Sequence, residues 1–248
     1  MTSSSFRNLQ SINDSPSILG QRSGQARSLS AVSTKHDTNV WVVAVIDSRG
    51  PSGEVGIAAI SSLTFECVVV ELCDTSRFTR CLRFLNIYSP AMLLCCDTPN
   101  SARLSQALRD AGLECPIEKC PRQWFNDLAG KEAVENMCML KTRESLLVTL
   151  DKRYYALSAF SALSNWIKEG GDKLHPNSFN IKYTAGDEGV MIIDYHTSKY
   201  LEIIRPLQTN GALDGKNTSS LLATVNQCKT MMGTRLLRSN LLQPSLGT

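Results

Sequence analysis

Apolar residues along the first half of the chain come in short, nearly uninterrupted runs, a pattern typical of strands buried on both faces of a sheet. The runs at 40–46, 55–60 and 65–72 are separated only by turn residues, so they predict three consecutive strands. Helical spacing and short apolar runs then alternate, which predicts a helix after Thr75 or Ser76, a strand at 91–96, a helix at 101–111 and a strand at 116–120. This order predicts an α/β fold with a mixed sheet, and we expect one domain over residues 39–139.

Residues 140–248 show a different pattern, in which apolar side chains recur every three or four residues. This spacing predicts one long helix at 143–168, capped by Thr142, and at 1.5 Å per residue that helix would be about 40 Å long. A helix of this length usually links domains or acts as a lever, so we expect 140–248 to begin a second, mainly helical domain. Its remaining predicted elements are short strands at 179–183, 190–195 and 200–204 and a last helix at 218–242.

The last predicted helix carries a wide apolar stripe, which needs a partner helix to cover it. Few residues follow that helix, so we expect the polypeptide to be a truncated part of a longer protein. We also expect the stripe to be incompletely covered, at Leu221, Val225, Cys228 and Met232.

Composition predicts a disordered N-terminal tail and argues against a membrane protein. Residues 1–38 contain ten serines and a single aromatic residue, so this segment is predicted to be a disordered tail. The chain of 248 residues is 42% hydrophobic with a net charge of +3, which is an ordinary globular profile. No apolar run approaches the roughly 20 residues of a membrane-spanning helix, and the N-terminus does not resemble a signal peptide. We therefore expect an intracellular protein without a membrane partner.

Nine cysteines are many for this length, but their spacing does not indicate a metal site. None of them forms a Cys-x-x-Cys pair, and the three histidines lie far from them in the sequence. In a reducing compartment such cysteines are most simply small apolar side chains of the core. We predict no metal ligands and no cofactor-binding residues.

Three carboxylates at or near predicted strand ends form the candidate catalytic set: Asp47, Glu71 and Asp97. Three strands followed by a helix and a strand, with carboxylates at strand ends, resemble the ribonuclease H plan. In that family the carboxylates bind two magnesium ions for phosphodiester hydrolysis. Carboxylates are also common wherever buried strands reach solvent, and Arg49 would hold Asp47 without a metal. We favour the same fold used as a scaffold and keep a metal-dependent nuclease as the alternative.

The C-terminal segment 201–248 has a modest basic bias, with five basic residues against two acidic ones. Its helix carries three candidate contacts to DNA or to phosphate: Lys229, Arg235 and Arg238. A nucleic-acid interface normally shows a denser basic face, so a solvated helix face is the alternative interpretation.

The sequence resembles the MutS family at several places. Residues 220–244 contain a Ser-Leu-Leu helix start, the motif Thr-x-x-Gly-x-Arg-Leu-Leu-Arg at 230–238 and a closing Leu-x-x-Pro at 241–244. These three parts look like the signature of the family's core. Residues 43–50 and 53–58 look like the start of its connector domain, and residues 154–159 and 191–194 fit the same template. The Arg-Ser-Asn sequence at 238–240 is closer to the meiotic members than to the mismatch-repair members.

This resemblance implies a ribonuclease H-like connector domain without nuclease activity at 39–139. Residues 140–248 would then be the beginning of the lever or core domain. The family's ATPase, with its ATP and Mg²⁺ sites, lies far downstream of the core signature and is not in this chain. The resemblance therefore implies a non-catalytic fragment that needs no cofactor of its own.

For the meiotic members the resemblance implies a heterodimer with the fifth MutS homologue. That heterodimer binds recombination intermediates such as Holliday junctions and promotes crossovers, and contacts with MutL homologues are expected as well. We accordingly expect a nuclear protein on meiotic chromosomes, acting through its full-length form.

Overall fold

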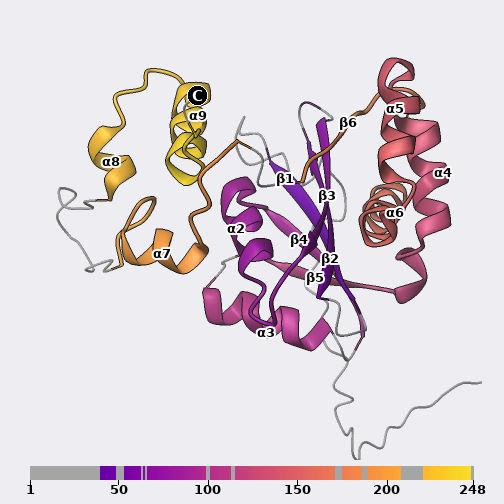
Figure 1. Ribbon diagram of the computed structural model, residues 1–248, viewed down its shortest axis with the longest axis horizontal. Helices are drawn as coiled ribbons and strands as arrows, with labels where there is room; N and C mark the ends of the chain where they lie inside the picture. The colour runs from indigo at the N-terminus through magenta and orange to yellow at the C-terminus, as the bar shows by residue number, and fades with distance from the viewer. Residues whose placement is uncertain are drawn as a thin grey trace, which may run out of the picture.

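The computed structural model describes residues 40–48, 53–62, 64, 66–98, 101–112, 115–170, 175–185, 189–207 and 220–246. The predicted disordered tail at 1–38 lies outside the described residues. The strands are β1 Trp41–Asp47, β2 Glu54–Ser61, β3 Glu66–Cys73, β4 Met92–Cys96, β5 Ile117–Cys120 and β6 Asn180–Tyr183. They form a single sheet in the order β5-β4-β1-β2-β3-β6, which is labelled in Figure 1.

The sheet is mixed, as the sequence pattern predicts. The first three strands form an antiparallel meander, while β4 runs parallel to β1, β5 to β4 and β6 to β3. The predicted strands at 40–46, 55–60, 65–72, 91–96 and 116–120 are confirmed within one or two residues. Parallel neighbours must be joined by crossovers, and a helix joins β4 to its neighbour β5. Another helix carries the chain from β3 to β4, which pairs with β1.

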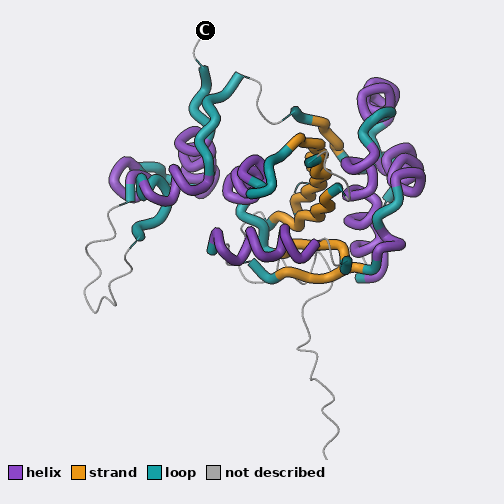
Figure 2. Tube along the Cα trace, turned by 60° about the horizontal axis from the view of Figure 1, so that its bottom comes forward, coloured by secondary structure: helices purple, strands orange, loops and turns teal. Residues whose placement is uncertain are grey.

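Helices cover both faces of the sheet, so its strands are buried on both sides. α2 Thr79–Tyr88 and α3 Ser101–Ala111 lie on one face, and α4 Asp127–Met137, α5 Leu140–Leu150 and α6 Tyr154–Glu169 lie on the other (Figures 1 and 2). Alternate residues of β1 divide between the two cores: Val43 and Val45 pack with α2 and α3, whereas Val42 and Ala44 pack with α6. The predicted helix at 101–111 is confirmed as α3, and Gly112 follows it with a φ of 71°.

The start of α2 is capped differently from the sequence prediction. Thr75 and Ser76 do not cap the helix; the Asp74 carboxylate accepts hydrogen bonds from the N–H groups of Arg80 at 3.2 Å and Cys81 at 2.8 Å. The residue that directly precedes the helix is Phe78, whose backbone is left-handed with a φ of 54°. Asp74, which directly follows β3, therefore takes the capping role predicted for Thr75 or Ser76 and satisfies free N–H groups in the first turn of α2.

The predicted single helix at 143–168 is wrong. α5 ends at Leu150, and α6 begins at Tyr154 after a turn in which the Arg153 N–H bonds the Leu150 carbonyl at 2.9 Å. α6 is buried almost all round, because it packs between the sheet and α4. A straight helix of about 40 Å would carry one of its two halves away from this core, so residues 143–168 do not form one long linking helix.

The predicted domain boundary between residues 139 and 140 stays a prediction. In the structure the same core continues past that point, because α5 and α6 pack on the sheet and β6 extends it. The predicted strand at 179–183 is confirmed as β6. The α/β unit as described therefore runs from β1 to β6.

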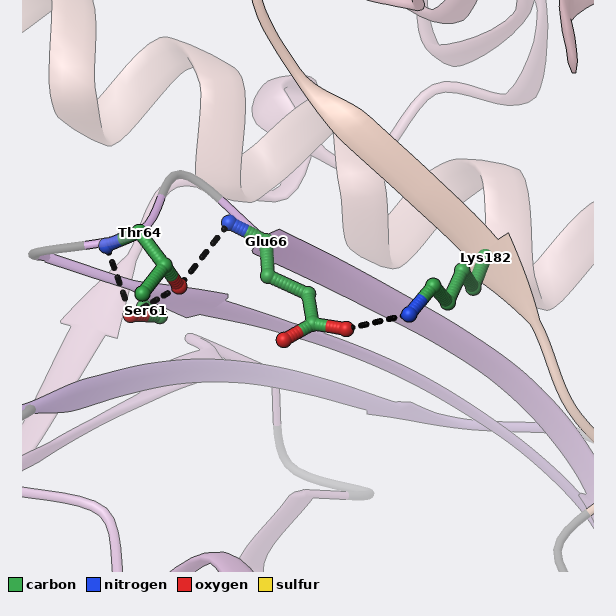
Figure 3. A network of polar contacts seen from close by, with 4 residues as sticks. All are labelled: Ser61, Thr64, Glu66 and Lys182. Atoms are coloured by element: carbon green, nitrogen blue, oxygen red, sulfur yellow. Dashed lines mark hydrogen bonds and ion pairs between the residues drawn. The ribbon is translucent and has the colours of Figure 1, made fainter. Parts of the chain in front are cut away.

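A small polar network lies where β6 meets β3 (Figure 3). Lys182 on β6 donates to the Glu66 carboxylate at 2.6 Å. The hydroxyl of Thr64 accepts from the Glu66 N–H at 3.4 Å and donates to the Ser61 hydroxyl at 2.8 Å. An exposed ion pair of this kind contributes about 1 kcal/mol or less, so the backbone ladder to β3 is what mainly holds β6 in place.

The C-terminal part consists of short helices that lie beyond α2 (Figure 1). They are α7 Tyr195–Tyr200, α8 Leu221–Val225 and α9 Met231–Leu242. The strands predicted at 190–195 and 200–204 are wrong: Asp194 caps α7 by accepting from the Thr197 N–H, and only an isolated bridge joins Val190 to Ser245. In the part of the chain that the structure describes, no helix is long and apolar enough to cross a membrane.

The last predicted helix is also divided in two. The sequence predicts one helix through 218–242, but residues 226–230 separate α8 from α9. Each half has its own cap: the Ser220 hydroxyl accepts from the Ala223 N–H at 3.1 Å, and the Thr230 hydroxyl accepts from the Gly233 N–H at 3.1 Å. A serine or threonine that competes for backbone N–H groups favours a new helix start over a continuous helix.

Candidate functional site

The three candidate catalytic carboxylates do not form a metal site. β1 and β4 are parallel neighbours, so Asp47 and Asp97 come at the same edge of the sheet, beside α3. Asp97 is exposed and pairs with Lys119 at 3.2 Å. Burial raises the pKa of Asp47, against the lowering effects of a backbone hydrogen bond and of the Arg103 charge. Of the three carboxylates, the fold therefore brings only Asp47 and Asp97 to the same edge of the sheet.

Glu71 lies on the opposite face of the sheet. Along β3 it lies on the same face as Cys67 and Val69 of the α6-side core. Its carboxylate accepts hydrogen bonds from the backbone N–H groups of Tyr155 at 3.0 Å and Ala156 at 3.1 Å. Arg153 approaches the same carboxylate at 3.8 Å. Among the described residues no group of three His, Cys, Asp or Glu side chains could hold a metal ion. The nuclease alternative is thus unsupported.

The bonds of Glu71 have a structural purpose, because they satisfy the N-terminal N–H groups of α6. The first residues of a helix have no partners within it, and a carboxylate is the acceptor that the helix dipole favours there. Burial raises the pKa of Glu71, while the two backbone bonds and the Arg153 charge act in the opposite direction. Only 9% of the Glu71 side chain is exposed, so these bonds have little competition from water.

Gly56 provides the room for this contact. It is the register partner of Glu71 on the neighbouring strand. A Cβ atom at Gly56 would lie 2.1 Å from the carbonyl oxygen of Tyr155 and 2.8 Å from the amide nitrogen of Ala156, far inside van der Waals contact. We call Gly56 and Glu71 together the α6 seat, since the glycine lets the helix approach the sheet and the glutamate bonds its first turn.

A second set of contacts joins the C-terminal helices to the α/β unit. Arg238 of α9 donates to the carbonyls of Asn86 at 2.6 Å and Ile87 at 2.8 Å, in the last turn of α2. The Tyr195 hydroxyl donates to the Ala111 carbonyl at 2.6 Å, and Lys199 donates to the same oxygen at 3.2 Å. Carbonyls at a helix C-terminus have no intrahelical partner and carry partial negative charge, which favours cations there. We call these contacts the helix-end junction.

The three predicted DNA or phosphate contacts lie in different surroundings. Lys229 and Arg235 are exposed, whereas Arg238 is half-buried in the helix-end junction. Burial lowers the pKa of Arg238, and the nearby charge of Arg205 lowers it further. Contact of these residues with DNA remains a prediction, but Arg238 has a clear structural role that the sequence did not indicate.

The apolar stripe of the C-terminal helices is incompletely covered, as expected. Cys228 is exposed, and the exposed fractions are 45% for Leu221, 42% for Val225 and 77% for Met232. Leu236 on α9 is 63% exposed. Isolated exposed apolar residues are ordinary, but several on adjoining helices form a surface suited to another protein segment.

Sequence reasoning missed the residues that hold the junction on the α7 side, Tyr195 and Lys199. Their helix is only six residues long, too short for a periodic pattern to show. The Gly56 contact did have a signal, because an isolated glycine inside a strand pattern often marks the close approach of another backbone.

Comparison with known proteins shows that the chain is similar to one family. The model of MutS domain III matches residues 196–248, which include α7, α8 and α9. Curated members of the same family match most of the chain, including the α/β unit. The chain is therefore similar to MutS-family proteins along most of its length.

The relatives carry the name of one particular member. The chain is 27% identical over 227 residues to MutS protein homolog 4 of Homo sapiens and 28% identical over 207 residues to that of Saccharomyces cerevisiae. It is 28% identical over 220 residues to DNA mismatch repair protein MSH4 of Arabidopsis thaliana. These matches cover 89%, 79% and 82% of this chain but 23%, 23% and 26% of the relatives. The chain thus spans about a quarter of the length of the curated relatives it matches.

Proposed function

We propose that this chain is a non-catalytic scaffold segment of a MutS-family protein that acts in meiotic recombination. The observation that carries the proposal is the similarity to MutS protein homolog 4 across the α/β unit and the C-terminal helices together. The match of residues 196–248 to MutS domain III supports it independently. In the full-length protein this segment would connect parts that contact DNA and a partner.

We further propose that the α/β unit is the family's connector domain, with a ribonuclease H-like fold and no nuclease activity. Three antiparallel strands followed by parallel β4 and β5 support the fold assignment. The lack of nuclease activity is supported by the role of Glu71, whose carboxylate bonds the first turn of α6 on the face away from Asp47. The continued core suggests that this domain extends to β6 at Tyr183, with the core domain beginning after it.

The remaining parts of the proposal concern the full-length protein. It would pair with the fifth MutS homologue, bind Holliday junctions and promote crossovers in the nucleus, on meiotic chromosomes. ATP and Mg²⁺ would be bound by the downstream ATPase of that protein, and MutL homologues would be further partners. The exposed apolar residues of α8 and α9 support a role inside a larger assembly, because they offer a surface for further helices.

A chimaera tests the proposed function. The matching segment of Saccharomyces cerevisiae MutS protein homolog 4 is replaced by this chain, and crossover frequency is measured in meiosis. We expect the chimaera to restore crossovers above the level of a strain without the protein, since the two segments would share one scaffold. A chimaera that accumulates normally and still gives the crossover level of that strain would contradict the proposal.

A further inference from the structure

A cleft of about 650 Å³ lies where the C-terminal helices meet the α/β unit. Residues from the ends of α2 and α3 form one wall, and residues of α7, of the segment after it and of α9 form the other. Clefts of this volume are typical of small-ligand sites, which often lie between structural units. The cleft does not overlap the α6 seat or the strand-end carboxylates.

The lining of the cleft is positively charged. Lys199, Arg205 and Arg238 all line it, and the described lining residues include neither Asp nor Glu. The charge of Arg205 lowers the pKa of Arg238 beyond the effect of burial, so the two guanidinium groups are close enough to repel each other. Cations gathered in a partly enclosed space repel one another, and an anion bound between them is attracted by all of them.

Two of these cations are already held in position by the helix-end junction. Arg238 uses two of its N–H groups for the carbonyls of Asn86 and Ile87, and a guanidinium has five N–H groups in all. Lys199 uses one donor for the Ala111 carbonyl, and an ammonium has three. Donors fixed in this way lose little side-chain freedom when a ligand binds, which favours affinity.

We propose that this cleft is a binding site for a phosphate-bearing anion, held by Lys199, Arg205 and Arg238. Phosphate fits these groups because arginine binds its oxygens with paired N–H donors and lysine acts as a point charge. The phosphate belongs either to a free nucleotide or pyrophosphate or to the backbone of DNA. Because the cleft lies at the junction, a bound anion would also hold the C-terminal helices against α2 and α3.

The test is calorimetric titration of this chain with inorganic pyrophosphate at low salt. Saturable binding is expected, and Arg205→Gln and Lys199→Gln should each weaken it by about tenfold, the usual loss for one charged hydrogen bond. The matched control is Arg235→Gln, which removes the same charge from an exposed site on α9 outside the cleft and should weaken binding by less than about twofold. Thermal unfolding of each variant establishes that its fold is intact.

Competition then distinguishes the two sources of phosphate. If duplex DNA displaces pyrophosphate and the Arg205→Gln variant loses both ligands, the site takes backbone phosphate. If ATP without Mg²⁺ displaces pyrophosphate and DNA does not, the site takes a free nucleotide. Binding of pyrophosphate that does not saturate, or that Arg235→Gln weakens as much as Arg205→Gln, would overturn the proposal, because it would indicate diffuse surface charge.

Discussion

Gly56→Ala is expected to destabilise the chain by about 3 kcal/mol or more. The new methyl group would lie 2.1 Å from the Tyr155 carbonyl oxygen, which belongs to backbone and has no rotamer to change. α6 would have to move off the sheet, and that movement would also lengthen the bonds from Glu71 to its first turn. Urea unfolding measured by tryptophan fluorescence is a suitable assay, since Trp166 on α6 is 1% exposed.

Gly233→Ala is the matched control for this substitution. The added methyl group would lie 3.3 Å from Cys228 Cβ and Thr230 Oγ1, a contact that a shift of a few tenths of an ångström relieves. Alanine also raises helix propensity. We expect a change of about 1 kcal/mol or less in the free energy of unfolding. Equal effects of the two substitutions, or a loss of less than about 1 kcal/mol for Gly56→Ala, would show that α6 does not depend on this close approach.

Glu71→Ala is expected to cost about 2–3 kcal/mol, because two backbone N–H groups of α6 would lose their acceptor in a buried contact. Glu71→Gln keeps an acceptor oxygen of similar reach and removes the charge, so we expect it to cost about 1 kcal/mol or less. Differential scanning calorimetry of both variants at neutral pH measures the contrast. A glutamine variant as unstable as the alanine variant would mean that the charge, not the acceptor, is what α6 requires.

The stability difference between the wild-type chain and Glu71→Gln should also depend on pH, which gives a second test of the Glu71 carboxyl group. Burial raises the pKa of Glu71 above its ordinary value of 4.5, so the folded state holds the proton more tightly than the unfolded state. The stability that protonation contributes is fully present below that unfolded value and is lost as pH rises through the raised folded value. The wild-type chain should therefore gain stability relative to Glu71→Gln as pH falls from neutrality toward 4.5. A difference that does not change with pH would contradict this account.

Most of the sheet could be predicted from sequence because its strands are buried on both faces. Runs such as 40–46 and 91–96 are apolar throughout, and that pattern has few alternatives at such lengths. The helices of the second half could not be placed in the same way. Leu150 and Tyr154 are four residues apart, so the helical spacing continues across the turn that separates α5 from α6.

The candidate site shows a different limit of sequence reasoning. Asp47, Glu71 and Asp97 all lie at or next to strand ends, and their residue types alone fit a metal site. Which face each side chain reaches depends on the register between strands, and a shift of one residue would exchange the faces. Glu71 pairs with Gly56 in the observed register, which places its carboxylate under α6 and away from Asp47. The chemistry of the residues was visible in the sequence, but their separation was not.

If this chain is a scaffold, its strand-end carboxylates serve the fold and not catalysis. The most direct measurement is incubation of the purified chain with a labelled four-way DNA junction and Mg²⁺, alongside the Asp47→Asn variant. Our account predicts that neither protein yields a cleavage product, because Glu71 bonds α6 on the other face of the sheet from Asp47. Cleavage that depends on Mg²⁺ and is abolished by Asp47→Asn would contradict it.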